Sequence, residues 1–418
     1  MPTWLPEKIV DLRIPEDIQL VGEGLLSFID AEVVPLEKAN ADLLRNERNL
    51  YGADGRYSAE VLQLRKQIRM KSAQAGYYTA LGAAELGGGG LGPLAAAHLH
   101  ELLARTYGPS RTLIHFVVVP SAFTNALTPV LKFLQPAAKE QFLPAIASGE
   151  RTLCFGLSEP DAGSDVLAMK TTAVLDGDHW VLRGTKQWIT NSPYADHAII
   201  FAVTEPAKAG VRKQITAFFV DTRSPGFDVT SVIRVMGHLG GETGIIALGD
   251  VRVPDSHRLG EVGGGMTVAM TGVNAGRIGL AASCVGYAQW ALALTVDYCK
   301  TRRTFGRPIC EHQAVQIHLA DAAIDIFTAR STVLNCAWRL SEGAEARAEI
   351  AIAKAYCTEM LGRVVDRCMQ VHGGMGMTND VGLEALYRWA RPMRIYDGTA
   401  EIQRRTIAME LINDSLRF

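Results

Sequence analysis

The segment IYDGTAEIQR near the carboxyl end places a single carboxylate, Asp397, between an aromatic residue and a glycine. Apolar neighbours favour burial, and burial raises the pKa of a carboxyl group above its usual value of about 3.9, which makes the anion a stronger base. Asp397 also suits the N-cap of a following helix, with Glu401 in its opening turns. The segment alone leaves both roles open, proton acceptor and helix cap.

Two segments in the middle of the chain combine hydroxyl and aromatic groups. The loop GLSEPDAGSD, residues 156–165, carries Ser158 and Ser164 and a stiffening proline. KQWITN follows at 186–191, where the period of a strand puts Trp188 and Thr190 on one face. This pair suits a planar ring, covering its face and hydrogen-bonding its edge. A core tryptophan beside a strand threonine is the simpler interpretation of this motif by itself.

A third segment, TRRTFGRPICEHQ at 301–313, carries phosphate-binding chemistry. Arg302 and Arg303 beside Thr304 suit a pyrophosphate, because planar guanidinium groups match phosphate oxygens. A solvated charge cluster is the alternative. The GGGGLG stretch at 87–92 follows a helix-like segment instead of the strand that a dinucleotide-binding fold requires. His98 and His100 lie two residues apart, on different faces of a helix, which disfavours metal binding.

Composition excludes several classes of protein. The 418 residues are 48% hydrophobic and 21% charged, which is typical of globular proteins. With 42 basic and 44 acidic residues the net charge is −2, so we expect no nucleic-acid partner. The seven cysteines form no CxxC motif, and the apolar runs noted, such as HFVVVP and HAIIFAV, are too short for a membrane span. The N-terminus lacks the apolar stretch of a signal peptide, and we expect a cytoplasmic protein.

Hydrophobic periodicity predicts an α–β–α order along the chain. Residues 1–150 have helical spacing, and the charged stretch 38–70 is interpreted as a solvated helical face. Residues 151–262 contain short alternating segments separated by turns, which favours an antiparallel barrel or sandwich. Residues 263–418 return to a helical period and predict a helical bundle. One helix there has a core face formed by Val315, Leu319, Ala322, Ile326, Val333 and Ala337.

Together these segments resemble the acyl-CoA dehydrogenase family over most of the chain. LSEPDAGSD, KQWITN, QVHGGMGMT and IYDGTAEIQR match the family's two signatures, and RRTFGRPICEHQ and FIDAEVVPLE match in order and spacing. The match is poor at about 36–75 and 110–135. The resemblance implies the family's α+β, three-domain fold, with an N-terminal helical domain (1–150), a middle β domain (151–262) and a C-terminal four-helix bundle (263–418).

The resemblance also implies FAD as cofactor and an oligomer, a dimer of dimers in which a neighbouring subunit completes each FAD site. The positions that match FAD contacts lie on the middle loop and strand, on the 301–313 segment and near the C-terminus. They are Phe155, Leu157, Ser158, Gly163, Ser164, Trp188, Ile189, Thr190, Arg302, Thr304, Phe305, His312, Gln313, Gln370, Gly373, Gly374, Thr399 and Glu401. The positions that match acyl-CoA contacts are Ser164, Asn274, Arg277 and Gly398.

By the same resemblance, Asp397 is the base that removes the α proton of an acyl-CoA thioester, while the β hydrogen leaves as hydride to the flavin. The product is a trans-2-enoyl-CoA, and an electron-transfer flavoprotein takes the electrons. Most members carry Glu at the base position. Others carry the base just before the arginine that matches Arg277, but here that position is Gly276. Asp is shorter than Glu by about 1.5 Å.

Three alternatives to a dehydrogenase stay open from the sequence. Nitroalkane oxidases, which are distant relatives, also use Asp, and oxygen reactivity would make the chain an acyl-CoA oxidase. The last alternative is a non-catalytic flavin or acyl-CoA binder in which Asp397 only caps a helix. Ser164 and Arg277 argue against the nitroalkane oxidase, because both match positions that contact a CoA thioester.

Overall fold

The computed structural model describes residues 11–416 apart from 122, 124–125, 207–212 and 237–240. The chain divides into two compact units. The helical unit comprises Met1–Ser27, Gly92–Arg111 and Arg277–Phe418, and the sheet unit comprises Phe28–Leu91 and Thr112–Gly276. Each unit has a hydrophobic core of its own.

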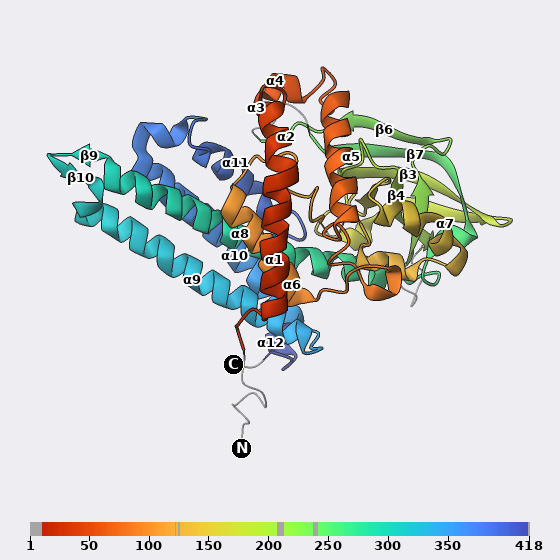
Figure 1. The fold of residues 1–418 in the computed structure, drawn as a ribbon. Coiled ribbons are helices and arrows are strands. Elements are labelled where there is room, and N and C mark those ends of the chain that lie inside the picture. Colours follow the sequence, from red (N-terminus) through yellow and green to blue (C-terminus); the bar gives the residue numbers. More distant parts are fainter. Residues whose placement is uncertain (1–10, 122, 124–125, 207–212, 237–240, 417–418) are drawn as a thin grey trace. The chain divides into compact units, whose positions relative to one another are not determined.

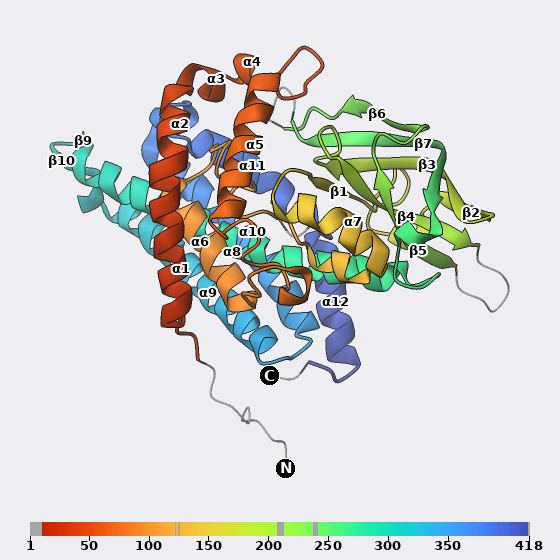
Figure 2. The same cartoon turned by 45° about the vertical axis from the view of Figure 1, so that its right-hand side comes forward.

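The sheet unit is built on one eight-stranded sheet (Figure 2). Its strands are β1 (Leu153–Gly156), β2 (Thr172–Asp176), β3 (His179–Thr190), β4 (His197–Glu205), β5 (Gln214–Asp221), β6 (Phe227–Val232), β7 (Thr243–Pro254) and β8 (Arg258–Leu259). They lie in the order β6-β7-β3-β2-β4-β5-β8, with β1 paired to β4. Most neighbours are antiparallel, as predicted, but β1 and β2 each pair with β4 in parallel, so the sheet is mixed.

The sheet unit also contains helices and short helical turns. They are η1 (Ile29–Val33), α2 (Val34–Ala39), α3 (Ala41–Arg45), α4 (Glu47–Leu50), α5 (Ala59–Gln74), η2 (Ala84–Leu86), η3 (Pro129–Phe133), α7 (Pro136–Ala147), η4 (Val166–Ala168) and η5 (Asp255–His257). The charged stretch 38–70 is therefore not one helical face, because a loop closed by a bridge between Tyr51 and Tyr57 interrupts it. Helix α7 packs on the sheet through Phe142, whose ring lies 4.9 Å from that of Phe219 on β5.

Seven of the described α-helices lie wholly or mostly in the helical unit. They are α1 (Glu16–Phe28), α6 (Pro93–Tyr107), α8 (Gly265–Thr301), α9 (Gln313–Ser341), α10 (Arg347–His372), α11 (Leu383–Met393) and α12 (Ala400–Ile412). Helix α10 packs against α9, α11 and α12. Helices α8 and α9 are joined by a two-stranded hairpin, β9 (Arg303–Thr304) and β10 (Arg307–Pro308), and run beside α10 (Figure 1). Two 3₁₀ turns, η6 (Ile309–Glu311) and η7 (Gly373–Met377), complete the unit.

The predicted fold class is confirmed: helical N- and C-terminal parts flank a central sheet in the sequence. On α9 the predicted core positions Ala322, Ile326, Val333 and Ala337 are buried, whereas Val315 and Leu319, near the hairpin, are only half-buried. Helix α8 is long and apolar enough to cross a membrane by composition, with a mean hydropathy of 1.3. However, 61% of that window is buried in the structure, which is typical of a core helix.

Candidate active site

Asp397 and Gly398 form a strained turn between α11 and α12. Their φ angles are +59° and +87°, in the left-handed region that residues other than glycine rarely adopt. A Cβ atom at position 398 would lie 2.6 Å from Nε2 of Gln403, so the turn requires glycine there. Asp397 adopts the left-handed conformation although, unlike glycine, it carries a Cβ atom that disfavours it. Such strain persists only where the surrounding structure enforces it, and it concentrates at functional sites.

The Asp397 carboxyl is half-buried between positive charges. Burial raises its pKa to about 6, although the nearby charges of Lys354 and Arg277 act to lower it. A carboxyl group with a pKa near 6 is ionised at neutral pH and is a stronger base than an exposed aspartate. The environment of Asp397 therefore suits a proton acceptor, as its flanking residues predicted.

Three side chains hold the carbonyl oxygens of this turn. Arg277 of α8 donates from Nε to the carbonyl oxygen of Asp397 at 2.9 Å, and Lys354 of α10 donates to that of Gly398 at 2.8 Å. Gln403 of α12 donates from Nε2 to both oxygens, at 3.2 Å and 3.0 Å. Lys354 and Gln403 are fully buried, and sequence reasoning missed both. A lysine in the helix-forming run AIAKAYC carries no local signal of burial.

Asp397 is not the N-cap of the last helix. That place belongs to Thr399, whose side-chain oxygen accepts a hydrogen bond from the backbone N–H of Ile402 at 3.3 Å. The helix-cap interpretation of Asp397 is therefore wrong. Glu401 is exposed in the first turn of α12.

In the sheet unit, the end of β3 is irregular. The register with β7 shifts between Lys186 and Ile189, and Trp188 has a φ of +64°. Such a bulge re-aims side chains: Ile189 points into the core, whereas Trp188 is 56% exposed and Thr190 is exposed too. The structure thus presents an aromatic face and a hydroxyl on neighbouring surface positions.

A buried ion pair fixes the polar loop of residues 156–165 to β3. Lys186, fully buried on β3, donates to Glu159 at 2.7 Å. Glu159 also accepts from the backbone N–H groups of Lys170 and Thr171, at 2.6 Å and 3.0 Å. Burial lowers the pKa of Lys186 to about 8, against the attraction of Glu159. Both residues lie in motifs noted in the sequence, but their pairing was not predicted, because 27 residues separate them.

The residues predicted along this loop have different surroundings. Phe155, Leu157 and Ser158 are half-buried, while Gly163 and Ser164 are exposed. The carbonyl oxygen of Ser158 accepts a hydrogen bond from the backbone N–H of Gln187 at 2.9 Å. The loop therefore lies against the strand that carries Trp188 and Thr190, which brings this part of the predicted site together.

In the helical unit, the hairpin after α8 groups a second predicted set. Phe305 and Gly306 form its turn with φ angles of +51° and +80°, and the Phe305 side chain is 96% exposed. Nε2 of His312 lies 3.2 Å from the Thr304 hydroxyl. Arg302 and Gln313 are exposed beside them.

The predicted glycine turn after α10 lies near the foot of this hairpin. His372 stacks on Tyr298 of α8 with ring centroids 4.3 Å apart, three residues before Thr301 ends that helix. Gln370, Gly373 and Gly374 are exposed, and a Cβ atom at either glycine would meet no atom within 4 Å. The exposed arginine, hydroxyl and open backbone on this end suit a pyrophosphate and its sugar.

Gly276 of α8, where some members of the resembled family carry their base, faces the ring of Phe123 within the sheet unit. A Cβ atom at this position would lie 2.1 Å from Cε2 of Phe123. Asn274, two residues earlier on the same helix, is half-buried. A carboxylate side chain at position 276 would therefore require the Phe123 ring to move.

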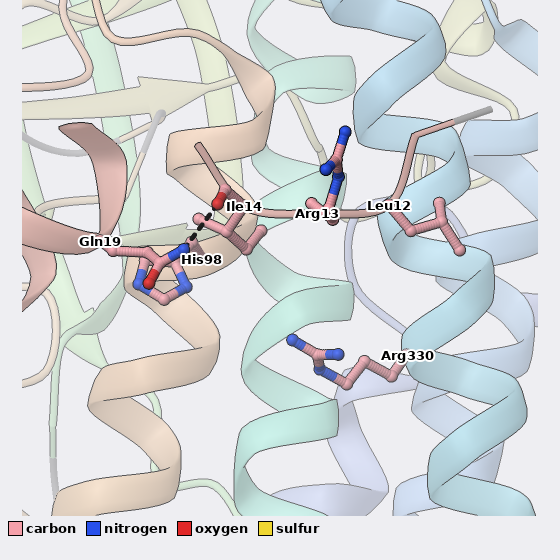
Figure 3. Close-up of a pocket in the computed structure, with 6 residues that line it drawn as sticks. All are labelled: Leu12, Arg13, Ile14, Gln19, His98 and Arg330. Atoms are coloured by element: carbon pink, nitrogen blue, oxygen red, sulfur yellow. Dashed lines mark hydrogen bonds between the residues drawn. The ribbon is translucent and has the colours of Figure 1, made fainter. Parts of the chain in front are cut away.

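A separate depression of about 470 Å³ lies in the helical unit (Figure 3). It is lined by Leu12, Arg13, Ile14, Gln19, His98 and Arg330. Arg13 pairs with Asp11, and Arg330 pairs with the buried Glu101 at 2.7 Å. None of the predicted site residues lines it. Among the described residues, no group of three or more His, Cys, Asp or Glu side chains is arranged to hold a metal.

Taken by their chemistry, the predicted positions fit FAD. The sheet unit offers an exposed indole beside a hydroxyl for a flavin ring. The helical unit offers an exposed arginine and open glycines for the phosphates and adenosine. The strained carboxylate lies in the helical unit, together with the Arg277 and Gly398 positions.

Comparison with known proteins agrees with this chemistry. The N-terminal, middle and C-terminal domains of acyl-CoA dehydrogenases match residues 28–150, 154–251 and 263–412. A 3-(aryl)acrylate reductase of Clostridium sporogenes is 37% identical over 347 residues, covering 83% of this chain and 90% of the relative. The human mitochondrial short-chain specific acyl-CoA dehydrogenase is 38% identical over 328 residues, covering 78% of each.

Among solved structures, the FAD complex of PigA superposes with a TM-score of 0.83 at 25% identity, covering 96% of this chain and 99% of that one. The three matched domains extend over most of the sequence in the order that the motifs predicted. The chain therefore belongs to the acyl-CoA dehydrogenase family of FAD-dependent oxidoreductases.

Proposed function

We propose that this protein removes hydrogen from the α and β carbons of an acyl-CoA thioester, with Asp397 as the base for the α proton. The observation that carries the proposal is the Asp397 carboxyl itself. It has a raised pKa of about 6 and is held on a strained turn by three side chains. A helix cap would need neither the strain nor the raised pKa, and Thr399 already fills that role.

The residues around Asp397 support the removal of a proton next to a carbonyl group. Near neutral pH the carboxylate is ionised and accepts the α proton. Negative charge then develops on the thioester oxygen, and it must be stabilised by nearby donors. The backbone N–H groups of Asp397, Gly398 and Thr399 form no hydrogen bond to other described residues. They precede the N-terminus of α12, whose dipole favours negative charge. FAD, when bound, supplies the acceptor for the β hydride.

The shorter base limits the substrate. Reacting atoms must approach within about 3–3.5 Å, so aspartate needs the α carbon closer to the turn than glutamate does. An acyl group that is branched, cyclic or aryl-substituted is consistent with this displacement. The relative named as an arylacrylate reductase supports testing aryl chains first.

We further propose the setting in which the enzyme works. An electron-transfer flavoprotein is the electron acceptor, the oligomer is a dimer of dimers, and the compartment is the cytoplasm. The predicted domains, 1–150, 151–262 and 263–418, are proposed as the units of this architecture. Arg302 of one subunit would reach the FAD of its neighbour, which is consistent with its exposure on the hairpin.

An anaerobic titration tests the proposal. The purified yellow protein is mixed with straight, 2-methyl-branched, cyclic and aryl-substituted acyl-CoAs, and the flavin absorbance near its visible maximum is followed. We expect bleaching by one class and its loss in Asp397→Asn protein that retains FAD. Bleaching by nitroalkanes instead, or none by any compound, would overturn it. Fast reoxidation of the bleached flavin by oxygen would identify an oxidase.

A further inference from the structure

The geometry points to Lys354 and Gln403 as positioning residues for the base. We infer that these two buried side chains orient the Asp397–Gly398 turn by holding its carbonyl oxygens. This inference rests on the proposed role of Asp397 and extends it to residues that touch neither substrate nor cofactor in the proposed mechanism.

The first observation is that both side chains are buried and hydrogen-bonded to the Asp397–Gly398 turn. Both are fully buried, and both point at the same turn from different helices, α10 and α12. Lys354 donates to the carbonyl oxygen of Gly398 at 2.8 Å, and Gln403 donates to the carbonyl oxygens of Gly398 and Asp397 at 3.0 Å and 3.2 Å. Burying an ammonium group is costly unless it makes strong interactions. If Lys354 served only to fill space, an apolar residue of similar size would give a more stable protein.

The second observation is the geometry of the peptide units. In a trans peptide the C=O and the following N–H point in opposite directions. Holding the oxygens of Asp397 and Gly398 toward Lys354 and Gln403 therefore turns the N–H groups of Gly398 and Thr399 away from these side chains. Those N–H groups have no partner among the described residues. Lys354 and Gln403 thus fix both the Asp397 backbone and the direction of the N–H donors beside it.

The third observation is the left-handed conformation of Asp397. With φ at +59°, the turn is not the conformation that aspartate would choose by itself. Arg277, the third holder, bonds only the Asp397 oxygen in this turn, at 2.9 Å. Without Lys354 and Gln403 the Gly398 oxygen would lose both of its donors, and the turn would relax. A displacement of about 1 Å at a reacting group costs up to a hundredfold in rate.

The charges around Asp397 make the two residues separable by pH. Lys354 from α10 and Arg277 from α8 are the cations that lower the pKa of Asp397. Burial lowers the pKa of Lys354 itself to about 8, and Asp397 and Glu401 of α12 act to raise it, so Lys354 is charged across the acid limb near pH 6. Tyr396 and Cys284 also lie near, but burial raises the pKa of the Tyr396 hydroxyl well above its ordinary value and that of Cys284 to about 12. Of the two substitutions, only the loss of Lys354 therefore removes a positive charge near Asp397. The loss of Gln403 changes the geometry of the turn alone.

The experiment is anaerobic stopped-flow flavin reduction by saturating substrate, as a function of pH, on FAD-loaded Lys354→Met and Gln403→Met proteins. In both we expect a plateau rate about 10- to 100-fold lower, with substrate Kd changed far less. In Lys354→Met we expect the acid limb, the part of the pH–rate profile where the rate falls at low pH, to move to higher pH. The reason is that a cation that favoured the ionised Asp397 carboxyl is gone. In Gln403→Met the limb stays. Lys354→Arg, which keeps the charge, restores the limb position.

Matched controls are Lys66→Met and Gln63→Met, two exposed positions on α5, which should leave rate and limb unchanged. Wild-type rates and limbs in both buried variants would overturn the inference. If Lys354→Met fails to fold, Gln403→Met and Lys354→Arg decide the matter by the same readouts. Asp397→Asn run in parallel separates the two proposals. If Asp397→Asn protein still reduces its flavin at the wild-type rate, Asp397 is not the base. If Asp397→Asn loses flavin reduction but the Lys354 and Gln403 variants behave like wild type, only the positioning role is refuted.

Discussion

A single carboxyl group sets the pH range of the proposed chemistry. Burial raises the pKa of Asp397 to about 6 in the presence of Lys354 and Arg277, so the group changes state within the range where the enzyme can be assayed. An aspartate in water would be fully ionised there. The residue therefore leaves a signature that a structural carboxylate elsewhere on the surface would not.

We predict that the rate of flavin reduction rises with pH through about 6 and is flat above. Below that value the base is protonated and cannot accept the α proton, so the rate falls about tenfold for each pH unit. Stopped-flow reduction between pH 5 and 8 measures this. The substrate should be an acyl-pantetheine thioester, because phosphate groups such as those of CoA also titrate near pH 6. A flat profile across this range would contradict the assigned base.

At the scale of elements, β3 and the loop of residues 156–165 form one structural unit. The bulge exposes Trp188 while Ile189 stays in the core, and the Glu159–Lys186 pair ties the loop to the same strand. Because the pair is buried, its two members depend on each other much more than a surface pair would. The loop's shape is thus set by a buried ion pair beneath the surface that carries Trp188 and Thr190.

We predict that Glu159→Gln lowers the free energy of unfolding by about 3–5 kcal/mol and weakens FAD binding, because it leaves the Lys186 ammonium buried without its counter-charge. Chemical denaturation of the FAD-free protein and the ratio of protein to flavin absorbance measure the two effects. Glu159→Leu combined with Lys186→Met should recover much of the stability. Equal losses in the single and double variants would show that the pair does not act as a unit.

The elements were predictable to different degrees, for physical reasons. The run QITAFFVD gave β5 at its observed bounds, because a short apolar run rich in β-branched and aromatic residues is a local signal. HWVLRG and KQWIT were expected as separate segments but form one strand, since Gly184, Thr185 and Lys186 pair in regular register with β7. Lys354 was invisible because its partner, Gly398, lies 44 residues further along the chain. Asp397 was found by its neighbours, and its competing role as a cap was excluded only by the position of Thr399.

At the scale of the whole molecule, α9 leaves large apolar side chains uncovered. Ile317, Ile324 and Phe327 are 56%, 64% and 76% exposed, and their spacing places them along one face of the helix. Such a stripe is expensive in water and marks an interface. A second copy of the chain is the occupant that the proposed oligomer supplies.

We predict that Ile324→Glu with Phe327→Glu lowers the molecular mass in solution, measured by light scattering at micromolar protein concentration. Two carboxylates in an apolar contact cannot be desolvated without cost. FAD should be lost in the same variant, because Arg302 is proposed to serve the neighbouring subunit. The control is Gln63→Glu with Lys66→Glu, which places two carboxylates at exposed positions on α5. A variant that keeps the wild-type mass would exclude this face from the interface.

The contact between Gly276 and Phe123 has a consequence for the ancestry of the chain. A Cβ atom at position 276 would lie 2.1 Å from the Phe123 ring, so an acidic side chain there requires the ring to move or to be replaced. We therefore predict covariation in an alignment of homologues: sequences with Asp or Glu at position 276 should carry a small residue at position 123. If this covariation is found, the aromatic ring at position 123 is one reason why this chain keeps its base on the turn before α12.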